Sequence, residues 1–556
     1  MASEIPRRRI LIVGAGAAGM AAAFTFSQHP DKFEVRVYER SSQPGGMATS
    51  FPIDRTKYGA DYINDGVQGA SPVFHNTFAM FDKLGFKSSE VDMQVSFGRD
   101  AETEFWSNVF PSRVIDQYKK DIKRFGRVLK IIKVLEPIFA LISVSTMLRM
   151  FGFSKDFGDV IVFPLVALFF GTGNQTPFIS SAILERVFMD PNMRLFEYSP
   201  ESFLASVPKM RAFPRLSYIY NTWKEFVESE SRGSVKVITN REVIRIKRLS
   251  DAKNASDSVE VWSRATKGTN VDQEVVDPGE EEKEVFDDMI LCVDADSALK
   301  ILGDDAGWLE RKILGNVKYL WDVTVTHSDQ DYMEKYYRVA YDPSLESQVG
   351  RDSPEKQERF KFAKENFRPL YFIRSHPEDK KKIEMSFDLS VYQPQFDGES
   401  PFGPDGKPVI GPLLSEAPNA ESSSKDVSTD KKRVYQTIFL DHAPESSKLW
   451  SKGDINQDEI ILEKWWKQQS HRWQHYAGTV PWMGLINGRR HTYFAGAWTV
   501  LNMHEIAIVS GFGAAYQLGA SYPFTNNPEC KRLFALCLAA NHMSRMRKDD
   551  RAGFWS

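Results

Sequence analysis

Residues 9–28, RILIVGAGAAGMAAAFTFSQ, decide the fold of this chain. The apolar run Ile10 to Val13 predicts a short buried strand, and the alanine-rich segment predicts a helix from about Met20 to Gln28. Residues 33–38, FEVRVY, alternate apolar and polar residues and predict a second strand. Strand, glycine turn, helix and strand in this order predict a βαβ unit, so we expect an α/β fold built on a parallel sheet.

The turn between the first strand and the helix carries the pattern GxGxxG at Gly14, Gly16 and Gly19. The first glycine permits the tight turn, the second lets the backbone approach a pyrophosphate, and the third lets the helix pack on the strand. The phosphate is expected at the start of the helix, near Ala17 and Ala18, where unpaired amides and the helix dipole favour an anion. A Rossmann-like dinucleotide site is therefore predicted; a plain strand-to-helix turn is the alternative.

Two features after the second strand favour the dinucleotide site. Glu39 ends that strand 20 residues after Gly19, where a carboxylate accepts hydrogen bonds from ribose hydroxyls. Arg40 follows directly and leaves a phosphate contact open. Gly45 and Gly46 form a second glycine pair, which suits backbone passing along the far phosphate.

The segment ERSSQPGGMA, residues 39–48, resembles the flavin amine oxidase and phytoene desaturase superfamily, which has an acidic residue followed by a glycine pair at this spacing. The resemblance implies a discontinuous FAD-binding domain, a mixed α+β substrate domain and a helical lobe. It also implies noncovalent FAD as the cofactor. The family often has Arg after the glycine pair, and Met47 stands in that place here.

The segment Thr492 to Ala520 is similar to the second flavin motif of the same family, in which a strand ends in FAG and a helix follows. The resemblance implies cofactor contacts from Gly496, Ala497, Glu505 and Ile506, although the desaturases usually have an acidic residue at the position of Ala497. Physically, the start of the helix near His504 would direct its dipole at the flavin ring. Glu505 has a second interpretation as a carboxylate that favours the helix dipole.

Two further segments agree with the family pattern. Val243 lies where these proteins place a valine whose backbone meets the adenine; an ordinary strand valine is the alternative. The segment KYGADYINDG, residues 57–66, resembles the stretch that leads toward the flavin ring, and it places Asp61 and Tyr62 among the candidate cofactor contacts.

His504 and Glu505 are the candidate catalytic residues. An imidazole titrates near neutrality and can move a substrate proton, although a packed or solvent-facing histidine is the alternative. Five tryptophans precede the second flavin motif and form either core or the wall of an apolar pocket: Trp450, Trp465, Trp466, Trp473 and Trp482. Zinc motifs, an EF-hand loop and a GxSxG nucleophile motif are absent from the sequence.

The composition limits the partners. The 556 residues carry a net charge of −3, so nucleic acid is not an expected partner. The N-terminus shows no cleavable signal peptide and only three cysteines occur, which predicts a cytoplasmic protein without disulfides. The apolar stretches 138–148 and 160–170 are shorter than the ~20 residues of a spanning helix, so membrane contact is expected to be peripheral at most. The oligomeric state stays open.

We expect five segments along the chain. Residues 1–110, 206–310 and 486–556 supply the three parts of the FAD-binding domain, and the middle part carries an acidic insertion. Residues 111–205 are richer in helical periodicity and predict a helical substrate lobe. Residues 311–485 predict the substrate domain, with a mobile loop at 397–432 that is rich in Pro, Gly, Ser and Asp.

These features predict an FAD-dependent oxidoreductase that removes hydride from an apolar small molecule, giving a desaturated or oxidised product, in a role that we associate with secondary metabolism. Three alternatives stay open: a flavin-dependent double-bond isomerase of a polyunsaturated lipid or polyene, an amine oxidase, and a non-catalytic binding protein similar to the GDP dissociation inhibitors. Product mass separates oxidation from isomerisation, and bound flavin separates the enzymes from the binding protein.

Overall fold

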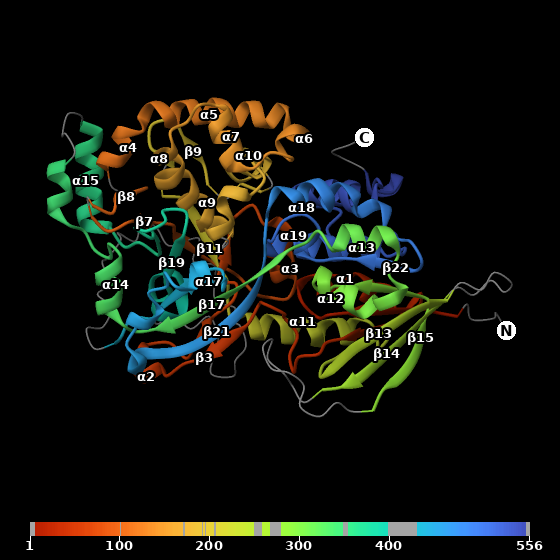
Figure 1. Ribbon diagram of the computed structural model, residues 1–556. Helices are drawn as coiled ribbons and strands as arrows, with labels where there is room; N and C mark the ends of the chain where they lie inside the picture. The colour runs from red at the N-terminus through yellow and green to blue at the C-terminus, as the bar shows by residue number, and fades with distance from the viewer. Residues whose placement is uncertain are drawn as a thin grey trace.

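The computed structural model describes residues 6–551 except 101, 110, 171–172, 192, 195, 205–206, 250–257, 267–279, 349–353 and 398–430. The predicted mobile loop 397–432 therefore lies outside the described residues, apart from its ends. A parallel sheet, a mixed seven-stranded sheet and a helical lobe form the molecule (Figure 1). The three cysteines are unpaired.

The parallel sheet has the strand order β12-β2-β1-β16-β22. Its strands come from distant parts of the chain: β1 (Arg8–Val13), β2 (Phe33–Tyr38), β12 (Val235–Ile238), β16 (Asp288–Leu291) and β22 (Thr492–Phe494). All four pairings are parallel. The α/β class and the discontinuous Rossmann-like core that the sequence predicts are confirmed.

Helices α1 (Ala17–Ser27) and α19 (His504–Gln517) pack against each other beside this sheet. The prediction that the first helix begins near Met20 is wrong by one turn, because Gly19 lies inside the helix rather than before it. A Cβ atom on Gly511 would lie 2.0 Å from the Ala18 carbonyl oxygen. Only glycine fits at this crossing, so the two ends of the chain meet there at backbone distance.

The seven-stranded sheet has the order β21-β17-β20-β19-β18-β7-β8 and forms the other half of the molecule (Figure 1). Its strands are antiparallel except for the β18–β7 pair. They are β7 (Val95–Phe97), β8 (Trp106–Ser107), β17 (Tyr319–His327), β18 (Tyr371–Ser375), β19 (Ile383–Asp388), β20 (Tyr435–Phe439) and β21 (Ile460–Gln469).

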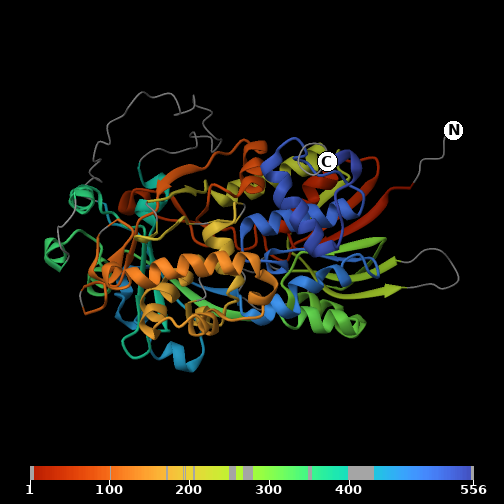
Figure 2. The same cartoon turned by 90° about the horizontal axis from the view of Figure 1, so that it is seen from above.

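The helical lobe lies along one edge of the molecule, and the view from above looks onto it (Figure 2). It contains α5 (Lys119–Val134), α6 (Glu136–Phe139), α7 (Val144–Met150), α9 (Phe163–Phe170) and α10 (Ala182–Met189). Pro164 does not interrupt the apolar stretch 160–170. The chain runs in helical turns without a break from α8 (Lys155–Phe157) through a π-helical turn (Gly158–Val162) into α9, and a π turn accommodates the missing amide of a proline. In the part of the chain that is described, no helix combines the length and apolar character needed to cross a bilayer.

The acidic insertion forms part of a three-stranded antiparallel sheet, β13-β14-β15. These strands are β13 (Arg241–Leu249), β14 (Ser258–Ala265) and β15 (Glu282–Phe286), and they lie beside the parallel sheet (Figure 1). Thr239 and Asn240 pass the chain from one sheet to the other, because β12 pairs with β2 and β13 pairs with β14.

We predict that Gly511→Ala destabilises the protein by about 3 kcal/mol or more, because the added methyl overlaps backbone on α1 that no side-chain movement can relieve. Thermal and urea unfolding measure the loss. The matched control is Gly513→Ala on the same helix, where the methyl meets only the His542 ring at 3.2 Å and helix propensity improves. Equal effects of the two substitutions would contradict this account of the crossing.

Candidate functional site

Packing dictates two glycines of the first motif. Gly14 has φ +97°, and a Cβ atom there would lie 2.8 Å from the Cys292 carbonyl oxygen. A Cβ atom on Gly19 would lie 1.9 Å from the Gly14 carbonyl oxygen. These glycines form the turn and hold α1 close to it, so they are needed whether or not a ligand binds.

Gly16 is different, because nothing in the fold requires a glycine there. A Cβ atom on Gly16 would meet only the Cα atom of Gly46, at 4.0 Å. Gly16 also forms a parallel bridge with Gly45, where the Gly45 amide donates to the Ala15 carbonyl at 2.9 Å. The GxGxxG turn and the Gly45–Gly46 pair therefore lie side by side at the start of α1.

The first turn of α1 supplies no anion of its own. The helix begins at Ala17 without a side-chain cap, and its first turn, which includes Ala18, contains no acidic residue. The free backbone amides and the helix dipole at this helix start suit a pyrophosphate.

The Glu39 carboxylate is buried and holds the glycine turn in place. It accepts hydrogen bonds from the Ala15 amide at 2.7 Å and the Ser41 amide at 2.9 Å. Each carboxylate oxygen keeps a further acceptor site, so a ribose hydroxyl can still donate to it. The Arg40 side chain is exposed.

Asp294 is a further carboxylate at the sheet edge that the sequence motifs did not indicate. It follows β16 at the carboxyl end of the parallel sheet, where ligands of such sheets bind. Burial raises the pKa of Asp294, while Lys467 and Arg40 act in the opposite direction. The side chain nevertheless keeps 43% of its surface accessible, and it lies 3.2 Å from the Lys467 ammonium group. Asp294 therefore lies at the sheet edge in an ion pair with Lys467, with part of its side chain open to solvent.

The FAG motif at the end of β22 needs its glycine. Gly496 has φ +147°, and a Cβ atom there would lie 2.8 Å from the Trp498 Nε1 atom. Its amide donates to the Ser510 hydroxyl of α19 at 2.8 Å, and Ala497 begins a 3₁₀ turn. This arrangement fixes the loop between β22 and α19.

Several buried polar atoms without a partner among the described residues belong to the segment 469–476, of which His475 packs against this loop. His475 lies against the backbone of Trp498 and Val500. The neighbouring unpartnered atoms are Gln469 Oε1, Ser470 Oγ, Gln474 Oε1 and Tyr476 Oη. Because buried polar groups normally find partners, this cluster fits a polar ligand such as a flavin ring.

Glu505 is directed away from this region. Its carboxylate accepts hydrogen bonds from the Asn76 amide at 2.8 Å and the Thr77 amide at 2.7 Å, in the first turn of α3 (His75–Lys83). Burial raises the Glu505 pKa, and these hydrogen bonds lower it. Glu505 thus satisfies the start of another helix, and Ile506 lies in the hydrophobic core.

His504 does face a pocket, but both of its ring nitrogens have partners. The Thr77 hydroxyl lies 3.1 Å from Nδ1 and the Tyr220 hydroxyl lies 2.8 Å from Nε2. Burial lowers the His504 pKa to about 4, so the ring is neutral near pH 7. Proton uptake would require the ring to leave one of these partners, and an acid–base role for His504 stays a prediction.

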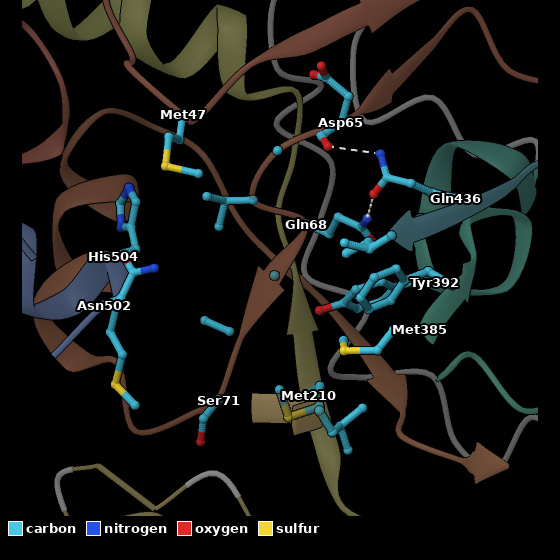
Figure 3. A pocket seen from close by; sticks show the side chains of 18 of the residues that line it. Met47, Asp65, Gln68, Ser71, Met210, Met385, Tyr392, Gln436, Asn502 and His504 are labelled. Carbon is cyan, nitrogen blue, oxygen red and sulfur yellow. Dashed lines mark hydrogen bonds between the residues drawn. The ribbon is translucent and has the colours of Figure 1, made fainter. Parts of the chain in front are cut away.

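The pocket lies between Met47 and the start of α19 on one side and the seven-stranded sheet on the other (Figure 3). Its volume is about 270 Å³. Met47 and His504 line one side, and Gln68, Tyr392 and Met385 line the opposite side. The wall is largely apolar and includes five methionines, whose flexible side chains suit an adaptable pocket: Met47, Met93, Met210, Met385 and Met503.

Other predicted residues lie elsewhere. Asp61 is exposed, and its carboxylate lies 3.8 Å from the Arg215 guanidinium group. The Tyr62 ring is buried beneath the same guanidinium group. The Val243 side chain is buried in the core between β13 and the parallel sheet. None of these three is among the residues that line the pocket.

The predicted segment 57–66 reaches the pocket only through Asp65 and Gly66. Of the five tryptophans, Trp466 both lines the pocket and is buried. Trp450 and Trp465 pack against a separate core cluster, and Trp482 is exposed.

A chain of hydrogen bonds crosses one wall of the pocket (Figure 3). The Gln436 amide donates to the Asp65 carbonyl oxygen at 2.9 Å, and the Gln68 amide donates to Gln436 Oε1 at 2.7 Å. Because a carbonyl can only accept, it fixes the orientation of Gln436 and then that of Gln68. The Gln68 Oε1 atom is left without a partner among the described residues, on a side chain that is only 7% exposed.

Asp65, the one acidic residue among the described lining residues, is already neutralised. The Lys464 ammonium group lies 2.7 Å from the Asp65 carboxylate, and both side chains are largely buried. Among the described lining residues there is no Lys, Arg or Glu. Nor do the described residues contain a group of three or more His, Cys, Asp and Glu side chains that could hold a metal ion.

Comparison with known proteins agrees with this geometry. Residues 12–84 match the NAD(P)-binding Rossmann-like domain family. Fatty acid isomerase from P. acnes, described as producing CLA, matches with TM-score 0.54 and 12% identity over 94% of this chain and 100% of its own. Putrescine oxidase bound to putrescine matches with TM-score 0.55 and 12% identity over 92% of this chain and 99% of its own.

Cyclohexylamine oxidase from Brevibacterium oxydans IH-35A matches with TM-score 0.53 and 10% identity, over 92% of this chain and 99% of its own. The chain has the fold of the flavin amine oxidase superfamily. Comparison with curated protein sequences gives no match.

The sequence motifs indicated the residues at the N-terminal side of the candidate site but not those on the seven-stranded sheet. Gly16, Gly45 and Met47 follow from motifs at the N-terminus. Gln68 and Gln436 come from segments without a motif, and only the pairing of distant strands places them together. The sequence could have indicated Asp294, because this residue follows an apolar strand and the carboxyl ends of parallel strands share one edge of the sheet.

Five buried or half-buried histidines predict that the protein loses stability in acid. Burial lowers the pKa of each from its ordinary value of 6.5 to about 3 for His471 and about 4 for the others: His327, His475, His504 and His542. Below pH 6.5 the unfolded chain binds protons that the folded chain does not, so stability falls as the pH falls toward 4. Two carboxyls oppose this trend, because burial raises the pKa of Asp322 to about 8 and of Asp388 to about 6.

We predict that His504→Gln flattens this pH dependence by up to about 1.4 kcal/mol per pH unit, because one proton-binding difference is removed while hydrogen-bonding capacity toward Thr77 and Tyr220 is kept. Urea unfolding at pH 7 and pH 5 measures the slope for both proteins. An unchanged slope in the variant would show that His504 titrates normally in the folded state.

Proposed function

We propose that this protein is an FAD-dependent oxidoreductase that oxidises or desaturates a neutral, apolar small molecule. One observation carries the proposal: Met47, beside the glycine pair, and His504, at the start of α19, line the same apolar pocket as the seven-stranded sheet. Two cofactor motifs that lie more than 400 residues apart thus bound a pocket of a size suited to a small molecule.

The residues present fit noncovalent FAD. Gly16, Gly45 and the start of α1 provide space and amides for the pyrophosphate, and Glu39 provides an acceptor for a ribose hydroxyl. The unpartnered polar atoms near Ser470 and Tyr476 provide hydrogen bonds for a flavin ring. When bound, FAD supplies the two-electron acceptor for a hydride from substrate carbon, and the protein contributes orientation and exclusion of water.

The charges of the pocket favour a neutral substrate. An ammonium group would meet only Asp65, which Lys464 already neutralises, and a carboxylate would meet no cation among the described lining residues. Burying an unpaired charge costs far more than burying a neutral group. This arrangement argues against amine oxidation and against a free fatty acid as substrate.

The hydrogen-bond chain adds a preference for a donor. Gln68 Oε1 needs a hydrogen-bond donor, and the fixed orientation of Gln436 prevents the Gln68 amide from turning to offer its NH₂ group instead. We therefore propose that the substrate carries a hydroxyl or N–H group on an apolar frame.

We predict that the purified protein carries FAD that is released on unfolding, and that Gly16→Val abolishes flavin binding while the fold stays intact. The valine side chain would fill the space over the start of α1 without touching other protein atoms at the Cβ position, except Gly46 at 4.0 Å. Absorbance spectra before and after denaturation measure the flavin, and circular dichroism with thermal unfolding measures the fold.

A protein that stays colourless and cannot be reconstituted with FAD would overturn the enzyme proposal and favour a binding protein. With flavin bound, product mass then separates the reactions. Loss of two hydrogens indicates oxidation or desaturation, and unchanged mass indicates double-bond isomerisation.

We predict that 2-naphthol binds about 3- to 10-fold more tightly than 2-methoxynaphthalene, because only the alcohol donates a hydrogen bond to Gln68 Oε1. In Gln436→Met this preference disappears, because the Gln68 amide is free to turn and can donate to the ether. Probe fluorescence or thermal shift measures both affinities.

The matched control is Ser71→Ala. The Ser71 hydroxyl also belongs to the pocket wall, but it already donates to the Arg194 carbonyl oxygen at 2.9 Å, so the preference should persist. Equal binding of the two probes to the unaltered protein would show that Gln68 does not select the ligand.

A further inference from the structure

The outer face of the helical lobe combines basic and apolar side chains. Helix α5 contains seven basic residues and one acidic residue in 16 positions. Its inner face is buried among the aromatic side chains of the lobe, through Ile122, Phe125, Val128, Leu129 and Ile132. The other two large apolar residues of α5, Ile131 and Val134, are exposed near its C-terminal end.

Large apolar residues are exposed where α5 ends and α6 begins. Val134 is 79% exposed, and Ile138 and Leu141 are each 55% exposed. Ile131 is 40% exposed and Leu135 is 42% exposed. Several large apolar residues exposed within one short segment of a protein surface mark a binding site rather than chance exposure.

The basic residues share the outward face of α5. At 100° per residue, Ile131 and Val134 lie on the same side of the helix as four basic residues: Lys120, Lys123, Arg127 and Lys130. These four side chains are exposed and form no ion pair with any described residue. We call these six residues, with Leu135, Ile138 and Leu141, the basic–apolar face.

Nearby acidic groups do not cancel this charge. Asp121 is paired with Arg124 at 2.9 Å, and Glu136 is paired with Arg186 at 2.7 Å. The basic–apolar face is therefore positive as well as apolar, although the whole chain has a net charge of −3.

We propose that the basic–apolar face docks on the surface of an anionic lipid bilayer, with α5 and α6 lying in the plane of the headgroups. Lysine and arginine ammonium and guanidinium groups would pair with lipid phosphates and carboxylates, while the apolar residues enter the acyl boundary. A second copy of this chain fits less well, because face-to-face association would set the four basic side chains against four others of the same charge.

The same lobe supplies part of the pocket wall, through Leu168 of α9 and Phe196. Docking would hold the pocket near the lipid bilayer, in which an apolar substrate dissolves. The surface proposal does not depend on the cofactor, since it follows from exposure and charge alone.

The test is flotation of the purified full chain with vesicles of phosphatidylcholine, with and without about 30 mol % phosphatidylserine. We expect binding only to the vesicles that contain phosphatidylserine, and loss of that binding when salt is raised to about 0.5 M, because salt screens exposed charges. The variant K120E/K123E/R127E/K130E should lower the partition coefficient by at least about tenfold.

The apolar half is tested by V134D/I138D, which places carboxylates at two exposed positions and should also release the protein from vesicles. The matched control is K236E/K247E/K300E/K312E, which changes the net charge of the chain by the same amount at exposed lysines far from the helical lobe. This control should bind vesicles as the unaltered chain does.

Failure of the unaltered chain to bind vesicles with phosphatidylserine would overturn the proposal, and so would equal losses in the face variant and its control. Sedimentation velocity supplies a further outcome. A dimer that dissociates in V134D/I138D would overturn membrane docking in favour of self-association. The flavin absorbance of each variant shows separately whether the cofactor site is affected.

Discussion

The close crossing of α1 and α19 is the constraint on which the site depends. Gly511 lies so near the Ala18 carbonyl oxygen that no side chain fits between them. This contact joins the first helix of the chain to one that begins about 490 residues later, and it thereby closes a sheet whose strands come from distant segments. Without that approach, Met47 beside the N-terminal glycine pair and His504 beside the FAG motif would not share a pocket.

A second constraint acts inside the pocket, where each buried polar group is oriented by its neighbour. The Lys464 ion pair removes the charge of Asp65, and the Asp65 carbonyl fixes the direction of the Gln436 and Gln68 amides. The result is a neutral wall with one unpartnered acceptor. Such a wall selects a ligand by its hydrogen-bonding groups rather than by its charge. The selection is strong, because a ligand without a donor leaves a buried acceptor unpaired.

The outer surface of the helical lobe differs from the pocket wall, because its basic and apolar side chains are exposed to solvent. Its inner face is a dense aromatic core, whereas its outer face exposes residues such as Val134 and Ile138 beside unpaired lysines. An exposed apolar side chain is costly in water and useful at an interface, so the same lobe both encloses the pocket and offers a surface. Glu505 shows how position decides the role of one residue, because its carboxylate serves the amides of α3 instead of the cofactor cleft.

The sequence by itself determined the α/β class, the glycine turn at Gly14 to Gly19, the acceptor at Glu39 and the glycine pair at Gly45. These features are local, because turn geometry and strand periodicity depend on residues close together in the chain. Only the tertiary structure decided that Glu505 points to α3, that Asp61 lies at the surface, and that Gln68 meets Gln436 across 368 residues. Local patterns cannot specify these contacts, because they depend on which distant strands and helices pack together, and that choice is made by the whole fold.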